Sequence, residues 1–387
     1  MSSPSQPSGR PRTVLVANPS ADLYGSDRMV VETVTGLVER GWRTVVTVSQ
    51  SGPLVSRMEE VGAEVVVCPA PVVRKANLTP RGVVELTRDI RRGIPRMRAL
   101  VRSVRPDVIY VSTVTVPFWL VVARWARVPV VVHVHEAESS IPALARWGLA
   151  APSSLANHVI YNSRTSRDVG RAAGLPRPSS TVIHNGVPGP VEVVPPRAGA
   201  DVPRLLYVGR LSPRKGVDVA VRAVGLLKER GVAARLTLVG AVFPGYEWYE
   251  QELQDLVHSA GLDSDVTFAG FLEDVWEPMA AADIVLVPSR SEESFGNTVI
   301  EAAMAARPVV VSDHTGLREA REHLRAAVPV VADDPAAVAD AIQSIVADWS
   351  GFRARAVDDA PQTARRHAPE TYRSQVEAVL SGLSRDG

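Results

Sequence analysis

The 387-residue chain has a single cysteine, Cys68, few aromatic residues and a formal net charge of only +1. One cysteine excludes an internal disulfide and is typical of a reducing compartment. Cys68 ends an apolar run, where a buried strand residue is favoured over a catalytic thiol. No stretch of 18 residues is both apolar and uncharged, and the N-terminal residues lack the apolar core of a signal peptide. We therefore expect a cytoplasmic protein without a membrane-spanning helix.

The small net charge conceals an asymmetry between the two halves of the chain. Residues 1–186 hold 23 Lys and Arg against 13 Asp and Glu, whereas the remainder holds 20 against 29. Eight of these arginines, with only two acidic residues, lie between Arg81 and Arg105. The run is either a solvated helix face or a surface for an anionic partner, such as an acidic membrane or a phosphorylated acceptor. Nucleic acid is not expected, because the run contains no aromatic residue.

Short Val- and Ile-rich runs alternate with amphipathic segments, such as residues 26–40, along the chain. Buried parallel strands have this composition, and the alternation predicts α/β doubly wound sheets. The length fits two domains of this kind. The expected strands are Thr13–Ala17, Thr44–Val48, Glu64–Val67, Val108–Val111, Val130–His133, His158–Tyr161, Arg204–Val208, Arg235–Val239, Val266–Phe268, Ile284–Val287, Val309–Val311 and Val328–Val331.

The Pro- and Gly-rich residues between these runs predict the domain boundaries. Residues 1–12 are expected to be a disordered tail, and residues 13–186 the first domain. Residues 187–203 are rich in Pro and Gly, which neither pair in a central strand nor continue a helix, so they are predicted as the linker. Residues 204–367 form the second domain. Tandem parallel sheets would bring their strand ends to one cleft, where ligands of such sheets bind.

Two motifs in the second half combine cations and carboxylates. Residues 208–216 read Val-Gly-Arg-Leu-Ser-Pro-Arg-Lys-Gly after a strand, so Arg210 and Lys215 converge at one turn. Glu293 and Glu301 are eight residues apart, where a strand meets a helix entered through a glycine. Fixed cations stabilise a diphosphate, and ionised carboxylates accept paired hydrogen bonds from vicinal hydroxyls. This combination favours recognition of a sugar nucleotide.

These motifs in this order resemble the retaining nucleotide-sugar glycosyltransferases of family 4, whose GT-B fold has two Rossmann-like domains facing across a cleft. Weaker agreements at Tyr24-Gly25-Ser26, His135-Glu136 and residues 184–187 extend the resemblance over nearly the whole chain. It implies an enzyme that moves a hexosyl-type sugar from a UDP-sugar, or secondarily a GDP-sugar, to a hydroxyl acceptor in glycan, glycolipid or natural-product biosynthesis. It also implies that a helix in residues 368–387 crosses back to the first domain.

The resemblance assigns roles to matching positions. Arg210 and Lys215 would bind the diphosphate, Glu293 the sugar hydroxyls and Glu301 the ribose, while His135 would lie near the anomeric carbon. Of these, His135, Glu293, Arg210 and Lys215 are the candidate catalytic residues. The donor-binding set is completed by Gly25, Gly240, Phe271, Ser294, Phe295, Gly296, Asn297 and Thr298. The candidate acceptor contacts are Tyr24, Asp27 and Glu136, and for Asp27 a helix-capping role is favoured.

No metal or cofactor is expected. Asp263-Ser264-Asp265 has the form with which other glycosyltransferases hold a divalent ion, but it precedes a strand and is predicted as a turn. His133 and His135 share one side of a strand, and a zinc site there would need more ligands than Glu136 supplies.

In the family mechanism the acceptor attacks on the face of the leaving group, so Glu293 is not expected to be a nucleophile. A nucleotide-sugar epimerase, an inverting transferase and a catalytically silent GT-B subunit remain the alternatives.

Overall fold

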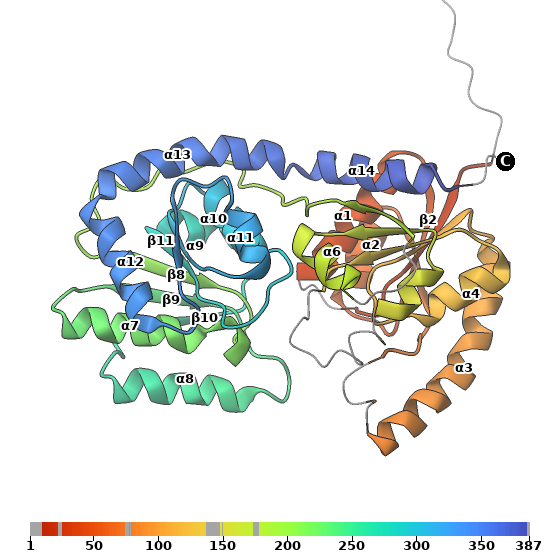
Figure 1. The fold of residues 1–387 in the computed structure, drawn as a ribbon, viewed down its shortest axis with the longest axis horizontal. Helices are drawn as coiled ribbons and strands as arrows, with labels where there is room; N and C mark the ends of the chain where they lie inside the picture. Colours follow the sequence, from red (N-terminus) through yellow and green to blue (C-terminus); the bar gives the residue numbers. More distant parts are fainter. Residues whose placement is uncertain are drawn as a thin grey trace, which may run out of the picture. The chain divides into compact units, whose positions relative to one another are not determined.

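The computed structural model describes residues 10–21, 25–73, 77, 79–136, 148, 150–172 and 178–384. The chain divides into two compact units (Figure 1). The first unit is Met1–Gly186 together with Pro369–Gly387, and the second is Val187–Ala368. Each unit contains one parallel sheet, of seven strands in the first and six in the second. The predicted fold class, two Rossmann-like doubly wound sheets, is confirmed.

The sheet of the first unit has the order β3-β2-β1-β4-β5-β6-β7. All its pairings are parallel. The order reverses between β1 and β4, and ligands of doubly wound sheets bind at the carboxyl ends of strands at such a point. The strands are β1 (Thr13–Ala17), β2 (Arg43–Val48), β3 (Glu64–Val67), β4 (Val108–Val111), β5 (Val130–Val134), β6 (His158–Tyr161) and β7 (Ser179–Val182).

Helices cover both faces of this sheet because successive strand residues point to opposite faces. Leu15 and Ala17 of β1 belong to the core under α3 and α4, whereas Val14 and Val16 belong to the core under α1, α2 and α14. The helical segments are α1 (Gly25–Glu39), α2 (Pro53–Glu60), α3 (Pro80–Val104), α4 (Phe118–Ala126), the 3-10 turn η2 (Ala151–Leu155), α6 (Arg164–Arg171) and α14 (Pro369–Ser381).

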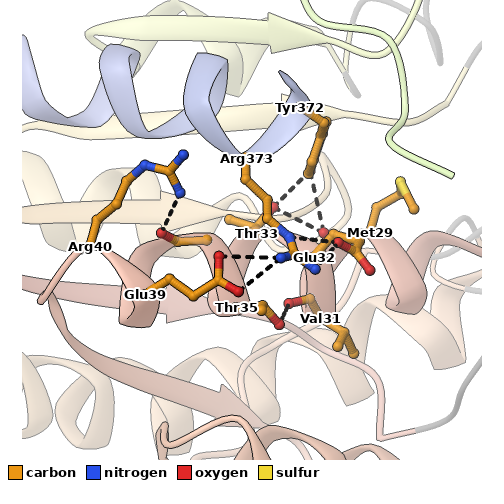
Figure 2. A network of polar contacts seen from close by, with 10 residues as sticks. Met29, Val31, Glu32, Thr33, Thr35, Glu39, Arg40, Tyr372 and Arg373 are labelled. Carbon is orange, nitrogen blue, oxygen red and sulfur yellow. Dashed lines mark hydrogen bonds and ion pairs between the residues drawn. The ribbon is translucent and has the colours of Figure 1, made fainter. Parts of the chain in front are cut away.

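The last helix, α14, packs on α1 through apolar contacts and through the polar contacts that Figure 2 shows. Its Tyr372, together with Val376 and Leu380, is buried in the core under α1. Arg373 forms ion pairs with Glu32 at 2.7 Å and Glu39 at 2.9 Å, both on α1. A Cβ at Gly36 would lie 2.5 Å from that of Arg373, so glycine permits this close approach. The end of the chain is therefore part of the first unit.

The sheet of the second unit has the order β10-β9-β8-β11-β12-β13, which reverses between β8 and β11. Helices α7, α8 and α12 cover one face, and α9, α10 and α11 cover the other (Figure 1). The strands are β8 (Arg204–Val208), β9 (Arg235–Val239), β10 (Val266–Gly270), β11 (Ile284–Val287), β12 (Val309–Ser312) and β13 (Ala327–Val330). The helical segments are the 3-10 turn η3 (Pro213–Lys215), α7 (Val217–Glu229), α8 (Glu247–Ser259), α9 (Trp276–Ala281), α10 (Asn297–Met304), α11 (Thr315–Arg321), α12 (Pro335–Ala347) and α13 (Trp349–Arg366).

Residues 187–203 contain no helix or strand. Contacts nevertheless hold this segment to the second unit. Arg197 forms an ion pair with the buried Asp283 at 2.6 Å, and its carbonyl oxygen accepts a hydrogen bond from Trp349 Nε1 at 3.1 Å.

The helices of the described residues are each too short or too polar to cross a lipid bilayer.

Candidate active site

Lys215 and Glu293 meet at the carboxyl ends of β8 and β11. These strands are neighbours, so the loops that follow them lie side by side. Lys215 Nζ lies 2.7 Å from Glu293 Oε1. The next residue, Gly216, has a φ of 66°, and a Cβ there would lie 2.0 Å from the carbonyl oxygen of Pro288. Glycine therefore lets the two loops touch, and the two sequence motifs form one cluster.

The buried carboxylate of Glu293 is held in its charged form. Its Oε1 also accepts a hydrogen bond from Ser289 Oγ at 3.0 Å. Burial alone would raise the pKa of Glu293, but the charge and hydrogen bond of Lys215, with smaller effects of Arg214 and Ser289, hold it below the ordinary value. Glu293 is consequently ionised at neutral pH.

A chain of hydrogen bonds fixes the backbone around Glu293. The Glu293 amide donates to Thr315 Oγ1 at 3.1 Å, and Thr315 Oγ1 lies 2.9 Å from His314 Nδ1. His314 Nε2 lies 2.7 Å from the carbonyl oxygen of Ser289. Because a carbonyl can only accept, Nε2 carries a proton and donates this hydrogen bond. This support for the loop was not predicted from the sequence.

Arg210 lies in the loop after β8. Its guanidinium carbon stacks over the ring of Phe243, 3.4 Å from the ring centroid, and its carbonyl oxygen accepts a hydrogen bond from the Tyr207 hydroxyl at 2.8 Å. The adjacent loop approaches closely, since a Cβ at Gly240 would lie 1.8 Å from the carbonyl oxygen of Gly209. Gly240 also has a φ of 147°, so its place in the candidate site is one that only glycine can fill.

The remaining donor candidates of this unit lie around the start of α10. Gly296 precedes the helix with a φ of 109°, and Asn297 is its first residue. Thr298 Oγ1 donates to the carbonyl oxygen of Val208 at 3.4 Å, which ties α10 to the end of β8. Ser294, the buried Phe295 and Glu301 lie on the same loop and helix. Phe271 follows β10, and its side chain is 56% exposed.

In the first unit, two histidines lie at the carboxyl end of β5. His133 is fully buried, its Nδ1 lies 2.6 Å from the Tyr110 hydroxyl, and its ring centroid is 4.0 Å from that of His135. Among the described residues, neither Nε2 atom has a hydrogen-bond partner. Burial lowers the pKa of His135 to about 4 and the pKa of His133 well below its ordinary value. Both imidazoles are therefore neutral at pH 7.

Glu136 follows these histidines, and its carboxylate accepts hydrogen bonds from the Thr113 hydroxyl and from the His135 amide, the latter at 3.0 Å. Asp27 is buried near the start of α1 and accepts hydrogen bonds from Asn18 Nδ2 at 3.4 Å and Ser20 Oγ at 3.3 Å. Gly25 is the first residue of α1. Tyr24 lies outside the described residues.

Neither metal motif forms an ion site in the part of the chain that the structure describes, where no three His, Cys, Asp or Glu side chains are grouped for an ion. Asp265 is instead engaged by two cations, Lys228 at 3.0 Å and Arg235 at 2.8 Å. Asp263 lies 3.2 Å from His258 Nδ1. Residues 263–265 form a turn, as predicted.

Comparison with known proteins places the chain in a family. The model of the Glycosyltransferase Family 4 domain matches residues 24–188, and that of the Glycosyl transferases group 1 domain matches residues 202–348. The chain belongs to glycosyltransferase family 4. The two matches fall on the two sheets, with a break at the segment predicted as the linker.

Several curated proteins are similar to this family 4 member over part of their length. A glycosyltransferase of Methanocaldococcus jannaschii is 33% identical over 41% of this chain and 40% of its own. Glycogen synthase of Mycobacterium tuberculosis is 28% identical over 66% of this chain and 64% of its own length. D-inositol 3-phosphate glycosyltransferase of Mycobacteroides abscessus is 29% identical over 69% and 62%. The matches thus span between 40% and 64% of these relatives.

Solved structures match nearly the whole chain. HepE of Anabaena, in complex with UDP and glucose, superposes with a TM-score of 0.80 at 22% identity and covers 95% of this chain and 99% of its own. Sucrose-phosphate synthase of Thermosynechococcus elongatus has a TM-score of 0.77 at 20% identity and covers 96% of this chain and 99% of its own. These likenesses establish the GT-B fold.

Proposed function

We propose that this protein is a retaining glycosyltransferase that moves a sugar from a nucleoside-diphosphate sugar to a hydroxyl group of an acceptor. The observation that carries the proposal is the 2.7 Å ion pair between Lys215 and the buried Glu293. A fixed cation and a fixed carboxylate stand together where the strand order of a parallel sheet reverses, and that is where such sheets bind nucleotides. Membership in family 4 supports the same conclusion.

The chemistry of the donor matches the charges on the loops after β8 and β11. A departing nucleoside diphosphate gains negative charge, which Arg210 and Lys215 stabilise from fixed positions. Glu293, ionised and held by Ser289, accepts hydrogen bonds from the sugar hydroxyls. Glu301 lies further along α10 and accepts hydrogen bonds from the ribose. The sugar and the nucleoside are thus bound by different carboxylates.

A UDP-sugar is the favoured donor, with a GDP-sugar as the second candidate. HepE, which shares the fold, was solved with UDP and with UDP-glucose. Relatives named for glycogen synthesis and for transfer to D-inositol 3-phosphate act on dissimilar acceptors. The acceptor is therefore proposed only as a hydroxyl compound of glycan, glycolipid or natural-product biosynthesis, and Asp27 and Glu136 as side chains that contact it.

Retention requires that the new bond forms on the face from which the old one leaves. In the proposed step the bond between the anomeric carbon and the diphosphate oxygen breaks while the acceptor oxygen bonds to the same face of that carbon. The acceptor proton passes to the departing diphosphate oxygen. Glu293 is not assigned as a nucleophile, because in this step the acceptor oxygen itself attacks the anomeric carbon. We assign the neutral His135 to the anomeric carbon, where its imidazole would bond a sugar hydroxyl.

The test is incubation of the purified protein with a panel of UDP- and GDP-sugars and simple hydroxyl acceptors, followed by NMR of the products. The proposal expects release of nucleoside diphosphate and a product with the anomeric configuration of the donor. An inverted product would identify an inverting transferase. A changed sugar still attached to its nucleotide would identify an epimerase. Binding without turnover of any donor would identify a silent subunit.

A further inference from the structure

A second ion pair lies beside the pair of Lys215 and Glu293 and joins the same two loops. Arg290 stands three residues before Glu293, and Asp218 stands three residues after Lys215, in the first turn of α7. Arg290 Nη1 donates to Asp218 Oδ1 and Nη2 donates to Asp218 Oδ2, each at 2.6 Å. This bidentate geometry fixes the relative orientation of the two groups as well as their distance.

Asp218 is buried, and other side chains also contact its carboxylate. The Tyr249 hydroxyl donates to Oδ1 at 3.1 Å, and Arg222 lies 3.8 Å from Oδ2. Separating Arg290 from a buried carboxylate costs free energy, because the charge that stays behind loses its closest partner. The pair therefore holds the two loops in one arrangement.

Backbone groups join the same loops beside this pair. The amide of Arg290 donates to the carbonyl oxygen of Arg214 at 2.9 Å. The side chain of Arg214 donates in return to the carbonyl oxygen of Glu292 at 3.1 Å. A movement of Arg290 would consequently move the turn that carries Lys215.

A third loop contacts Arg290 and has an unusual backbone conformation. Asp333, after β13, accepts a hydrogen bond from Arg290 Nε at 2.5 Å and has a φ of 62°. Thr315, which accepts from the amide of Glu293, has a φ of 39° although it is β-branched. Non-glycine residues rarely adopt positive φ, and such strain is concentrated at functional sites, where the surrounding structure maintains it. The contacts of Arg290 and Glu293 are thus maintained at a cost in backbone energy.

The nitrogens of Arg290 are bonded to protein carboxylates. Its Nε is bonded to Asp333 and its two terminal nitrogens to Asp218. Lys215 differs, because in the proposed function it leaves Glu293 to reach the diphosphate. When that contact opens, the pair of Arg290 and Asp218 stays closed and still joins the two loops.

We propose that Arg290 is a positioning residue, which through Asp218 keeps the loops of Lys215 and Glu293 at the separation that a nucleoside-diphosphate sugar requires. The inference rests on the proposed function and deepens it, since it names the group that holds the donor site together. A displaced loop would weaken both the diphosphate contact and the sugar contact. Lys215 and Glu293 each make one of these contacts, so the effect of Arg290 can be distinguished from theirs.

The experiment is titration calorimetry of the full-length protein with UDP and a UDP-sugar, or with the GDP pair if only that binds. Arg290→Gln should weaken the binding of both ligands about tenfold, a typical size for coupling within one ion-pair network. Asp218→Asn should have a similar effect. The double variant should bind about as weakly as either single variant, because the same pair is broken in all three. Arg290→Lys, which keeps the charge but not the bidentate geometry, should recover part of the affinity.

The matched control is another bidentate pair of the same unit. Arg197 Nε and Nη2 donate to the two carboxylate oxygens of the buried Asp283 at 2.7 and 2.6 Å. Asp283 directly precedes β11, whereas Arg290 follows the carboxyl end of that strand. Arg197→Gln should lower the temperature of thermal unfolding as Arg290→Gln does, because each breaks a pair with a buried carboxylate. It should bind both ligands as the wild type does.

Three results would overturn the positioning role while leaving the proposed function intact. The first is that Arg290→Gln binds both ligands as Arg197→Gln does. The second is that Asp218→Asn binds as the wild type does or more tightly, since an Arg290 released from Asp218 would then be a direct ligand of the diphosphate. The third is that the two effects add in the double variant. If the wild type binds no nucleotide, the proposed function itself fails and the positioning role fails with it.

Discussion

The ion pair between Lys215 and Glu293 determines how each residue can act. Both groups are largely buried and neutralise each other at 2.7 Å. In the proposed function Lys215 turns toward the diphosphate and Glu293 toward the sugar. The two side chains then lose their contact with each other, and each gains a contact with the donor. A preorganised donor to developing charge contributes on the order of 100-fold to turnover. The Lys215→Ala variant should therefore lose about this factor or more in kcat.

Steady-state kinetics with the best donor measure this loss. The control is Lys228→Ala, which removes an exposed lysine of the same unit that pairs with Asp265. Near-normal turnover of Lys215→Ala would remove Lys215 from the mechanism.

Independence from divalent metals is a second expectation at this scale. In the proposed function Arg210 and Lys215 supply the positive charge that a metal would bring, and the carboxylate of Asp265 already pairs with Lys228 and Arg235. Transfer should continue in excess chelator, and Asp265→Asn should change kcat little. Loss of activity in chelator, with recovery on adding manganese or magnesium, would contradict this expectation.

The buried histidines make stability depend on pH. Since the folded pKa values of His133 and His135 are below the ordinary one, the unfolded chain binds protons first as the pH falls. Their contribution is complete above about pH 6.5 and falls toward pH 4, by up to about 1.4 kcal/mol per pH unit for each histidine. Urea unfolding across this range should show a shallower slope for His135→Asn.

At the scale of elements, Arg373 adds ion pairs to the apolar packing of α14 on α1. Arg373 is 16% exposed and pairs with the buried Glu32 (Figure 2). Burial keeps the pKa of Glu32 above its ordinary value in spite of this partner. Removing one member of a buried pair leaves an uncompensated charge, so Arg373→Ala should cost about 3 kcal/mol of unfolding free energy.

The other partner of Arg373 provides the comparison. Glu39 is 53% exposed, and Glu39→Gln should cost less than about 1 kcal/mol. Chemical denaturation of both variants measures the difference. Equal, small costs would show that apolar packing of Tyr372 and Leu380 alone holds the helix.

Strands were predictable from the sequence where burial of both sheet faces requires apolar residues. The Val- and Ile-rich strands were located to within a residue or two, because both faces of a covered parallel sheet must be apolar. The edge strand β7, Ser179–Val182, was missed because its sequence Ser-Ser-Thr-Val is mostly polar.

The site was predictable as motifs but not as contacts. The neighbouring positions of β8 and β11 bring the Lys215 and Glu293 loops together, and no local pattern encodes that pairing. The support from His314 and Thr315 lies on a third loop, which has no motif. The contact of Tyr110, on β4, with His133 also has no motif that would predict it. Such contacts depend on tertiary packing and leave no periodic signal in the sequence.

At the scale of the whole molecule, the candidate residues are divided between the two units. The cations and carboxylates assigned to the donor lie in Val187–Ala368, whereas His135 and Glu136 lie in the first unit. Donor affinity and transfer should therefore respond to different substitutions. His135→Ala should lower kcat with little change in the Kd of the free nucleotide, as compared by titration calorimetry and product assays. A matching loss of nucleotide affinity would argue against this division.

The proposed function requires that the second unit bind the sugar and the ribose of a nucleoside-diphosphate sugar through separate carboxylates. Titration calorimetry of wild type, Glu301→Gln and Glu293→Gln with UDP and a UDP-sugar, or the GDP pair if only that binds, tests it most directly. We predict that Glu301→Gln weakens the binding of both ligands, because both carry ribose. Glu293→Gln should weaken the binding of the sugar nucleotide, which loses a contact to its sugar. It should not weaken the binding of the free nucleotide, because Lys215, released from its ion pair, can still bind the diphosphate. The reverse pattern, or no binding of any nucleotide by the wild type, would contradict the account.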